Sequence, residues 1–189
     1  MPESRSIFLC ASGVIFASMV AQLLAPHCVL DQAAATTDVA DPAWGTIENL
    51  TLTRTQDGDR FAATSADGYH QIVRTAQVMA PGRHRVSIET EFNGTPDFAI
   101  EIGGPHQSYA RVAADLRTGK LTTMKGSSLD AGSEPLGPGR FRWWVDQDYV
   151  PGEVEYKFGV LGPDDTTTFP GQASCRVILS NPSFRPVEK

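Results

Sequence analysis

The stretch GRFRWWVDQDYVPGEVEYKFGVL, residues 139–161, decides the predicted fold of this chain. Apolar and polar residues alternate on both sides of Val150-Pro151-Gly152, where a proline followed by a glycine is typical of a turn. A period of two is the pattern of a β-strand that packs one face and leaves the other open to solvent or a ligand. We therefore predict two strands joined at this turn, with Trp143 in the core and Trp144 on the outer face.

The composition places the rest of the chain in the same structural class. The 189 residues suggest one domain, and 17 glycines and 13 prolines separate many short apolar runs. This punctuation is typical of an all-β protein with frequent turns. The net charge is −6 and the basic residues are scattered along the chain, which argues against nucleic acid as a partner.

Further strands are predicted wherever apolar and polar residues alternate between turn signals. Asn93-Gly94 is typical of a hairpin turn, and the stretch 125–138 is expected to be a long polar loop. About nine or ten short strands favour an antiparallel β-sandwich over residues 43–189. The other expected strands are 47–55, 61–65, 69–78, 84–92, 98–102, 108–116, 120–124 and 175–180.

The N-terminal segment differs from the rest because residues 7–25 carry no charge over about 19 positions, the length that just spans a bilayer. We expect residues 1–28 to be an export signal or a signal anchor helix rather than a buried core helix. Ala33-Ala34-Ala35 offers a cleavage site, so cleavage and anchoring both stay open. Residues 29–42 are expected to be a linker. The domain is then periplasmic, on the cell surface or secreted, and touches a membrane through this segment alone.

Three cysteines are present. Cys10 lies in the apolar segment and is expected to act there as a small hydrophobic residue. Cys28 and Cys175 could form one disulfide in an oxidising compartment. The alternative is that both thiols are unpaired, because Cys28 lies in a segment that export would leave flexible or remove.

Four motifs carry a resemblance to a known group. They are RTAQVMAPGRHRVSIETEF at 74–92, ADLRTG at 114–119, GRFRWWV at 139–145 and VILSNPSF at 177–184. Together they resemble the carbohydrate-binding-module-like jelly rolls, galactose-binding-like β-sandwiches found in phage tail fibres, in surface proteins and beside glycoside hydrolases.

The resemblance spans roughly residues 69–184 and implies a jelly-roll sandwich that binds a glycan without cleaving it. Two motifs depart from the group's pattern. Gly139-Arg140-Phe141 stands where "G-W-Y" is usual, and Pro182-Ser183-Phe184 stands where the closing "Q-L-E" is usual. No catalytic residue and no calcium site carry over from the resemblance.

The binding site is predicted on an open sheet face. Trp144 would form a platform on which the apolar face of a sugar ring packs, while charged neighbours bind its hydroxyl groups. A polar, aromatic groove results if the strands that carry these residues belong to one sheet. The alternative is that the segment 125–138 covers Trp144 and that the charges form a solvated face. The predicted carbohydrate-binding residues are Trp144, Arg142, Tyr109, Arg111, Glu101 and Asp146.

Signals for other chemistry are weaker. Paired carboxylates could cleave glycosidic bonds, and the candidates are Glu89, Glu91, Glu101 and Asp146, but the chain has too many acids for this to discriminate. His70, His84 and His106 lack metal-ligand spacing and are expected on the surface. We therefore expect no metal site and no cofactor.

Three functions remain open at this point. The first is an exported, non-catalytic module that binds a cell-surface or extracellular polysaccharide. The second is a structural or assembly protein of the bacterial envelope that makes protein contacts through the same face or an exposed strand edge. The third is a polysaccharide-degrading enzyme, which needs a deep cleft lined by acids.

Overall fold

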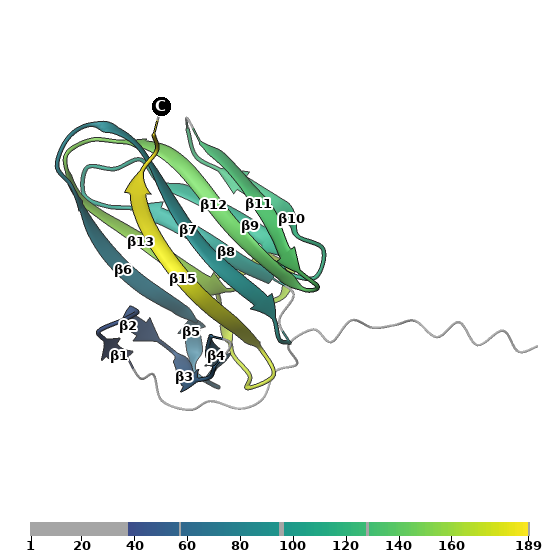
Figure 1. Ribbon diagram of the computed structural model, residues 1–189. Helices are drawn as coiled ribbons and strands as arrows, with labels where there is room; N and C mark the ends of the chain where they lie inside the picture. The colour runs from purple at the N-terminus through teal and green to yellow at the C-terminus, as the bar shows by residue number, and fades with distance from the viewer. Residues whose placement is uncertain (1–37, 57, 95–96, 128, 189) are drawn as a thin grey trace, which may run out of the picture.

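The computed structural model describes residues 38–56, 58–94, 97–127 and 129–188, and it shows an all-β sandwich of two antiparallel sheets (Figure 1). The predicted export segment, residues 1–28, lies outside the described residues, as does most of the predicted linker. Within the described part of the chain, no helix has the length and apolar character needed to cross a membrane.

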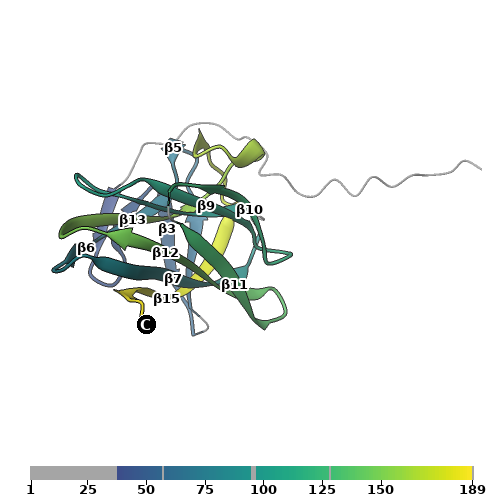
Figure 2. The same cartoon turned by 90° about the horizontal axis from the view of Figure 1, so that it is seen from above.

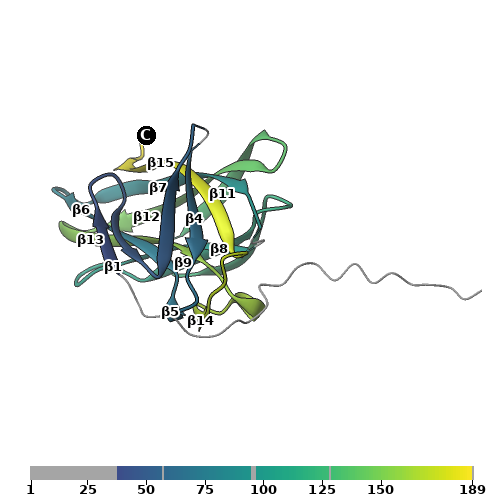
Figure 3. The ribbon, with the colours of Figure 1, turned by 90° about the horizontal axis from the view of Figure 1, so that it is seen from below.

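Two large sheets and one small sheet make up the domain (Figure 2). The seven-stranded sheet has the order β1 (Asp38–Asp41), β2 (Gly45–Glu48), β6 (Gln71–Val78), β13 (Gly152–Val160), β8 (Asp97–Gly103), β9 (Ala110–Asp115) and β10 (Lys120–Lys125). The six-stranded sheet has the order β11 (Asp130–Gly137), β12 (Arg140–Tyr149), β7 (Gly82–Phe92), β15 (Arg176–Pro186), β4 (Asp59–Ala63) and β3 (Leu50–Arg54). The short strands β5 (Asp67–Tyr69) and β14 (Thr168–Pro170) pair with each other at one end of the sandwich (Figure 3).

The core lies between the two large sheets and is built by the predicted alternation. Trp143 is 1% exposed, and its indole N–H donates a hydrogen bond to the Thr90 hydroxyl at 2.8 Å. Trp144 is partly exposed, so the predicted parity of the two indoles is confirmed. Large side chains such as Phe61, Phe98 and Phe158 fill the space between the sheets. Burial of each such side chain contributes about 1.5–3 kcal/mol.

The segment 125–138, predicted as a loop, contains β11, an edge strand that pairs with β12. The loop prediction was wrong because this segment is polar and holds glycine and proline, and edge strands tolerate these residues. Gly132 of β11 lies opposite Trp144 of β12. The six-stranded sheet therefore has β11, and not β12, at its edge.

The turns between the predicted strands have different outcomes. Thr118-Gly119 joins the paired strands β9 and β10, with Gly119 at a φ of 72° that favours glycine. Asn93-Gly94 does not form a hairpin, because β7 and β8 belong to different sheets. The turn at 150–152 likewise passes the chain from β12 in one sheet to β13 in the other. An alternating pattern predicts a strand but does not name its partner.

The N-terminal part of the sandwich differs in detail from the prediction. The strand expected over 47–55 is divided between β2 and β3 at Asn49, whose φ of 52° interrupts the extended backbone. The strand β1 begins at Asp38, within the stretch expected to be a linker. These short strands gather at the end of the sandwich opposite the C-terminus (Figure 1).

Candidate functional site: the outer face of the seven-stranded sheet

Two exposed tyrosines lie beside the outer face of the seven-stranded sheet. Tyr69 is 48% exposed at the end of β5, and Tyr109 is 54% exposed directly before β9. Burial raises the pKa of the Tyr109 phenol, and the nearby charge of Glu101 and the neighbouring Tyr69 raise it further, against the opposing effect of Arg111 and Lys157. Both phenols therefore lie in one electrostatic neighbourhood, with ring surface open to solvent.

A row of charged side chains crosses the sheet between them. Lys157 of β13 lies directly opposite Glu101 of β8, and Glu101 lies directly opposite Arg111 of β9. Buried residues alternate with these charged residues along each strand, so the charged side chains point outward. Arg111 lies 3.5 Å from the Glu101 carboxylate and donates a hydrogen bond to the Asp165 backbone carbonyl at 2.7 Å.

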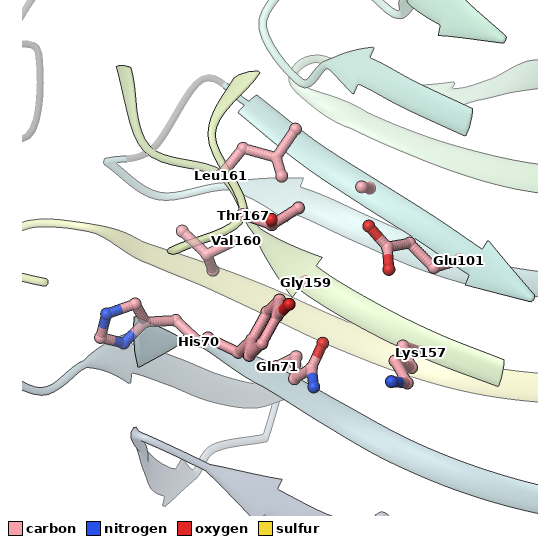
Figure 4. A pocket seen from close by; sticks show the side chains of 10 residues that line it. His70, Gln71, Glu101, Lys157, Gly159, Val160, Leu161 and Thr167 are labelled. Atoms are coloured by element: carbon pink, nitrogen blue, oxygen red, sulfur yellow. The ribbon is translucent and has the colours of Figure 1, made fainter. Parts of the chain in front are cut away.

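A shallow hollow opens beside this row (Figure 4). Gly159 and Ala99 line it without long side chains, and Glu101 and Lys157 lie on one side while Leu161 and Thr167 lie on the other. Its volume is about 10 Å³, close to the space that one water molecule occupies. A larger ligand would therefore lie across this face rather than inside it.

The loop after β13 forms one wall of the hollow. Leu161 packs on Ala99 and Ala113 of the sheet, and the Thr123 hydroxyl donates a hydrogen bond to the Asp165 carboxylate at 3.3 Å. Asp165 has a φ of 59°, in the left-handed region, where a non-glycine backbone is strained. Contacts to the sheet at both points hold this wall in place.

His70 fixes the other end of the same loop, and the prediction of a surface histidine was wrong. Its ring is 1% exposed, with Nδ1 2.9 Å from the Asn49 carbonyl and Nε2 2.9 Å from the Phe169 carbonyl. It therefore links the start of β3 to β14. His84 is partly exposed and stacks on Phe184, whereas His106 is exposed.

The opposite face of the sandwich carries Trp144, but this indole is not an open platform. The Arg85 guanidinium lies 4.4 Å from the centre of the Trp144 ring. Arg85 also holds Asp146 through two hydrogen bonds of 2.7 and 2.8 Å. A Cβ added at Gly132 would come within 2.6 Å of the indole, so β11 packs closely against it. The packing alternative considered for Trp144 therefore describes its surroundings better.

The six predicted site residues do not form one groove. Trp144, Arg142 and Asp146 lie on β12 of the six-stranded sheet, whereas Tyr109, Arg111 and Glu101 lie at β8 and β9 of the seven-stranded sheet. The prediction that they share a face was wrong, because alternation fixes which side of a strand faces out but not which sheet holds the strand. Tyr69 and Lys157 were not predicted as site residues, and neither was Gln71, which also lines the hollow. Lys157 alternates with the apolar residues of β13, and this pattern is a usable signal that its side chain points outward.

The four carboxylates considered for glycosidic cleavage are each paired with an arginine. The pairs are Glu89 with Arg142, Glu91 with Arg140, Glu101 with Arg111, and Asp146 with Arg85. Burial would raise the pKa of Glu89, but hydrogen bonds from Arg142 and Asn181 outweigh it, so the pKa is lowered. A general acid needs the opposite shift.

Among the described residues, no group of three or more His, Cys, Asp and Glu side chains could hold a metal ion. Cys175 is buried and disulfide-bonded, but Cys28, its predicted partner, lies outside the described residues, as does Cys10. A separate apolar groove of about 880 Å³ lies beside the β6–β7 turn, where Met79 is 87% exposed and Phe184 and Pro186 line the wall.

Neither a protein-family model nor a curated protein matches the chain. Among solved structures it is similar to the carbohydrate-binding module CBM35 from Cellvibrio japonicus Abf62, with 14% identity, a TM-score of 0.38, and coverage of 74% of this chain and 88% of that chain. It is also similar to a CBM4 module, with 12% identity, a TM-score of 0.38, and coverage of 85% and 94%. A third similar structure, Xyl-CBM35 in complex with a disaccharide containing glucuronic acid, has 17% identity, a TM-score of 0.36, and coverage of 85% and 97%. These distant similarities are to carbohydrate-binding modules, the group that the sequence resembles.

Proposed function

We propose that this domain is a non-catalytic carbohydrate-binding module whose ligand lies on the outer face of the seven-stranded sheet. The observation that carries the proposal is the pair of half-exposed tyrosines, Tyr69 and Tyr109, on either side of a polar row. Sugar rings have apolar C–H faces that pack on aromatic rings, and their hydroxyl groups need both donors and acceptors. Lys157, Arg111 and Glu101 supply these groups.

The experiment is a glycan array followed by calorimetry on the glycans that bind. We expect Tyr69→Ala and Tyr109→Ala each to weaken binding about tenfold, the effect of losing one aromatic packing contact of ~1.5 kcal/mol. Tyr69→Phe should retain most of the affinity because the ring stays. Met79→Ala is the matched control, since it removes an exposed apolar side chain at the other end of β6.

Two results would contradict the proposal. Failure of the folded wild-type domain to bind any glycan would exclude the function. Glycan binding that survives both tyrosine substitutions would exclude this face as the site.

The supporting argument for a binding role over an enzymatic one is geometric. The outer face of the seven-stranded sheet between Tyr69 and Tyr109, here called the tyrosine face, is shallow. The four candidate carboxylates are held by arginines. We also propose export, on the strength of the uncharged segment 7–25, and the jelly-roll subtype of sandwich, because successive strands such as β6, β7 and β8 alternate between the two sheets. Mass spectrometry of the mature N-terminus tests export.

Protein contact in the envelope is the alternative function. The observation that favours it is the apolar groove beside Met79, whose side chain is 87% exposed within the described part of the structure. Size-exclusion chromatography with light scattering separates the two functions. A defined oligomer without glycan affinity would favour protein contact, whereas a monomer that binds glycan would favour the module.

A further inference from the structure

We propose that the ligand of the tyrosine face is an uncharged oligosaccharide that crosses the strands from Tyr69 to Tyr109. This inference rests on the proposed function and specifies the class of glycan. It depends on two independent features of the face: how its charges are paired, and how far apart its two aromatic rings are anchored.

The first feature is that the cations beside the hollow already have carboxylate partners. Burial would lower the pKa of Lys157, but its hydrogen bond to Glu155 and the charges of Glu155, Glu101 and Glu48 outweigh burial, so the pKa is raised. Its ammonium lies 3.0 Å from the Glu155 carboxylate. The guanidinium of Arg111 is held between Glu101 and the Asp165 carbonyl.

An acidic sugar would have to compete for cations that the protein has already neutralised. Its carboxylate would also approach Glu101 and Glu155, and like charges brought together are unfavourable. Hydroxyl groups do not meet this obstacle, because they can donate to the carboxylates and accept from Lys157 without changing the ion pairs. Lys125, on the edge strand β10, is exposed to solvent, so an ion pair between it and an acidic sugar would contribute little to binding.

The second feature is the separation of the two aromatic residues. Tyr69 lies two residues before the start of β6, and Tyr109 lies one residue before the start of β9. The strands β13 and β8 lie between β6 and β9 in the sheet. Three inter-strand spacings amount to about 14 Å. Lys157, Glu101 and Arg111 cross this interval in register. The register places Tyr109 level with Thr75 of β6, six positions from Tyr69, so the two tyrosines are also offset along the strands. A ligand that contacts both must therefore extend over more than one sugar ring and cross the strands obliquely.

The test uses tetrasaccharides and their monosaccharides as probes in calorimetry at low salt: cellotetraose, xylotetraose, mannotetraose and tetragalacturonate, together with the neutral and acidic glycans of the array. We expect a neutral oligosaccharide to bind at least tenfold more tightly than its monosaccharide and than tetragalacturonate. Tyr69→Ala or Tyr109→Ala should lower the affinity for the tetrasaccharide to that for a shorter fragment.

A charge variant sharpens the test. Glu155→Gln removes the partner of Lys157 and should raise tetragalacturonate binding relative to the neutral probe about two- to fivefold, the range for an exposed ion pair. Glu134→Gln is the matched control, because Glu134 is also an exposed carboxylate in an ion pair but lies on the other sheet, next to Arg142. It should leave the ratio unchanged.

The outcomes separate the two proposals. Tyrosine-dependent binding that prefers acidic glycans, or that is equally tight for a monosaccharide, overturns this inference while the proposed function stands. Absence of binding to every glycan overturns the proposed function itself, and this inference with it.

Discussion

The two outer faces of this sandwich are both rich in charge, yet they treat their aromatic residues in opposite ways. On the six-stranded sheet, Arg85 stacks on Trp144 and the strand β11 packs against the indole. On the face of the seven-stranded sheet, Tyr69 and Tyr109 keep about half of their surface open. Aromatic content alone therefore does not identify a binding face, since a neighbouring guanidinium can occupy the ring surface that a sugar would need.

The difference also shows in how ion pairs are arranged. On the six-stranded sheet, Arg142 bridges Glu89 of β7 and Glu134 of β11, so three strands are tied together around it. On the seven-stranded sheet, Lys157 and Arg111 are paired beside a hollow with a floor of small residues. The first arrangement ties strands together around a covered indole, whereas the second lies beside tyrosine rings that stay open to solvent.

The largest expected effect comes from the buried side of β12. Trp143→Ala should lower the free energy of unfolding by about 3–5 kcal/mol, because it opens a cavity in the core and removes the hydrogen bond to Thr90. Denaturant unfolding measures the change. A loss below 1 kcal/mol would contradict the assignment of this indole to the core.

Gly132→Val should lower the free energy of unfolding by about 1–3 kcal/mol through overpacking. The new side chain would meet Trp144 at a position where even a Cβ lies 2.6 Å from the indole. The double variant with Trp144→Ala should recover part of this loss, since it removes the colliding ring. Additive losses in urea unfolding would show that β11 does not pack on the indole.

Trp144→Ala should lower the free energy of unfolding by about 1–2 kcal/mol, through lost burial and the lost cation–π contact with Arg85. Glycan affinity measured by calorimetry should stay within twofold of the wild type. A tenfold loss of affinity in the folded variant would reverse the comparison and make the six-stranded face the binding face.

The smallest expected effect concerns acid stability on the six-stranded face. The pKa of Glu89 is lowered in the folded protein, so the ionised side chain contributes stability that is present above its unfolded pKa of about 4.3 and is lost as pH falls through the lower folded value. Glu89→Gln should cost less than about 1 kcal/mol at pH 7, and this cost should vanish near pH 2. Urea unfolding from pH 7 to pH 2 measures it, and a cost that does not depend on pH would contradict the role of the charge.

The class of fold could be predicted from the sequence because strand formation is a local property. The alternation around Trp143 and Trp144 placed both indoles correctly, since each side chain of a strand takes the side opposite to its neighbour. Strand partners could not be predicted in the same way. The pairing of β11 with β12, and the placement of β9 in the other sheet, depend on contacts between residues distant in sequence.

The candidate site was predicted in part for the same reason. Tyr109, Arg111 and Glu101 were selected by residue type and side, and they do lie together. Tyr69 was not selected because it lies at the end of a three-residue strand, β5, whose position depends on pairing with the distant strand β14. Open ring surface is a property of the assembled structure, and no local pattern reveals it.

The repeated passage of the chain between sheets has a kinetic consequence. Because β6, β7 and β8 follow one another in sequence but belong alternately to the two sheets, neither sheet can be completed before the other has begun to assemble. Such a topology pays the entropy of closing long loops before most contacts form, and domains of this kind refold in milliseconds to seconds. The outer faces of the two sheets should therefore appear together during refolding, as one cooperative event.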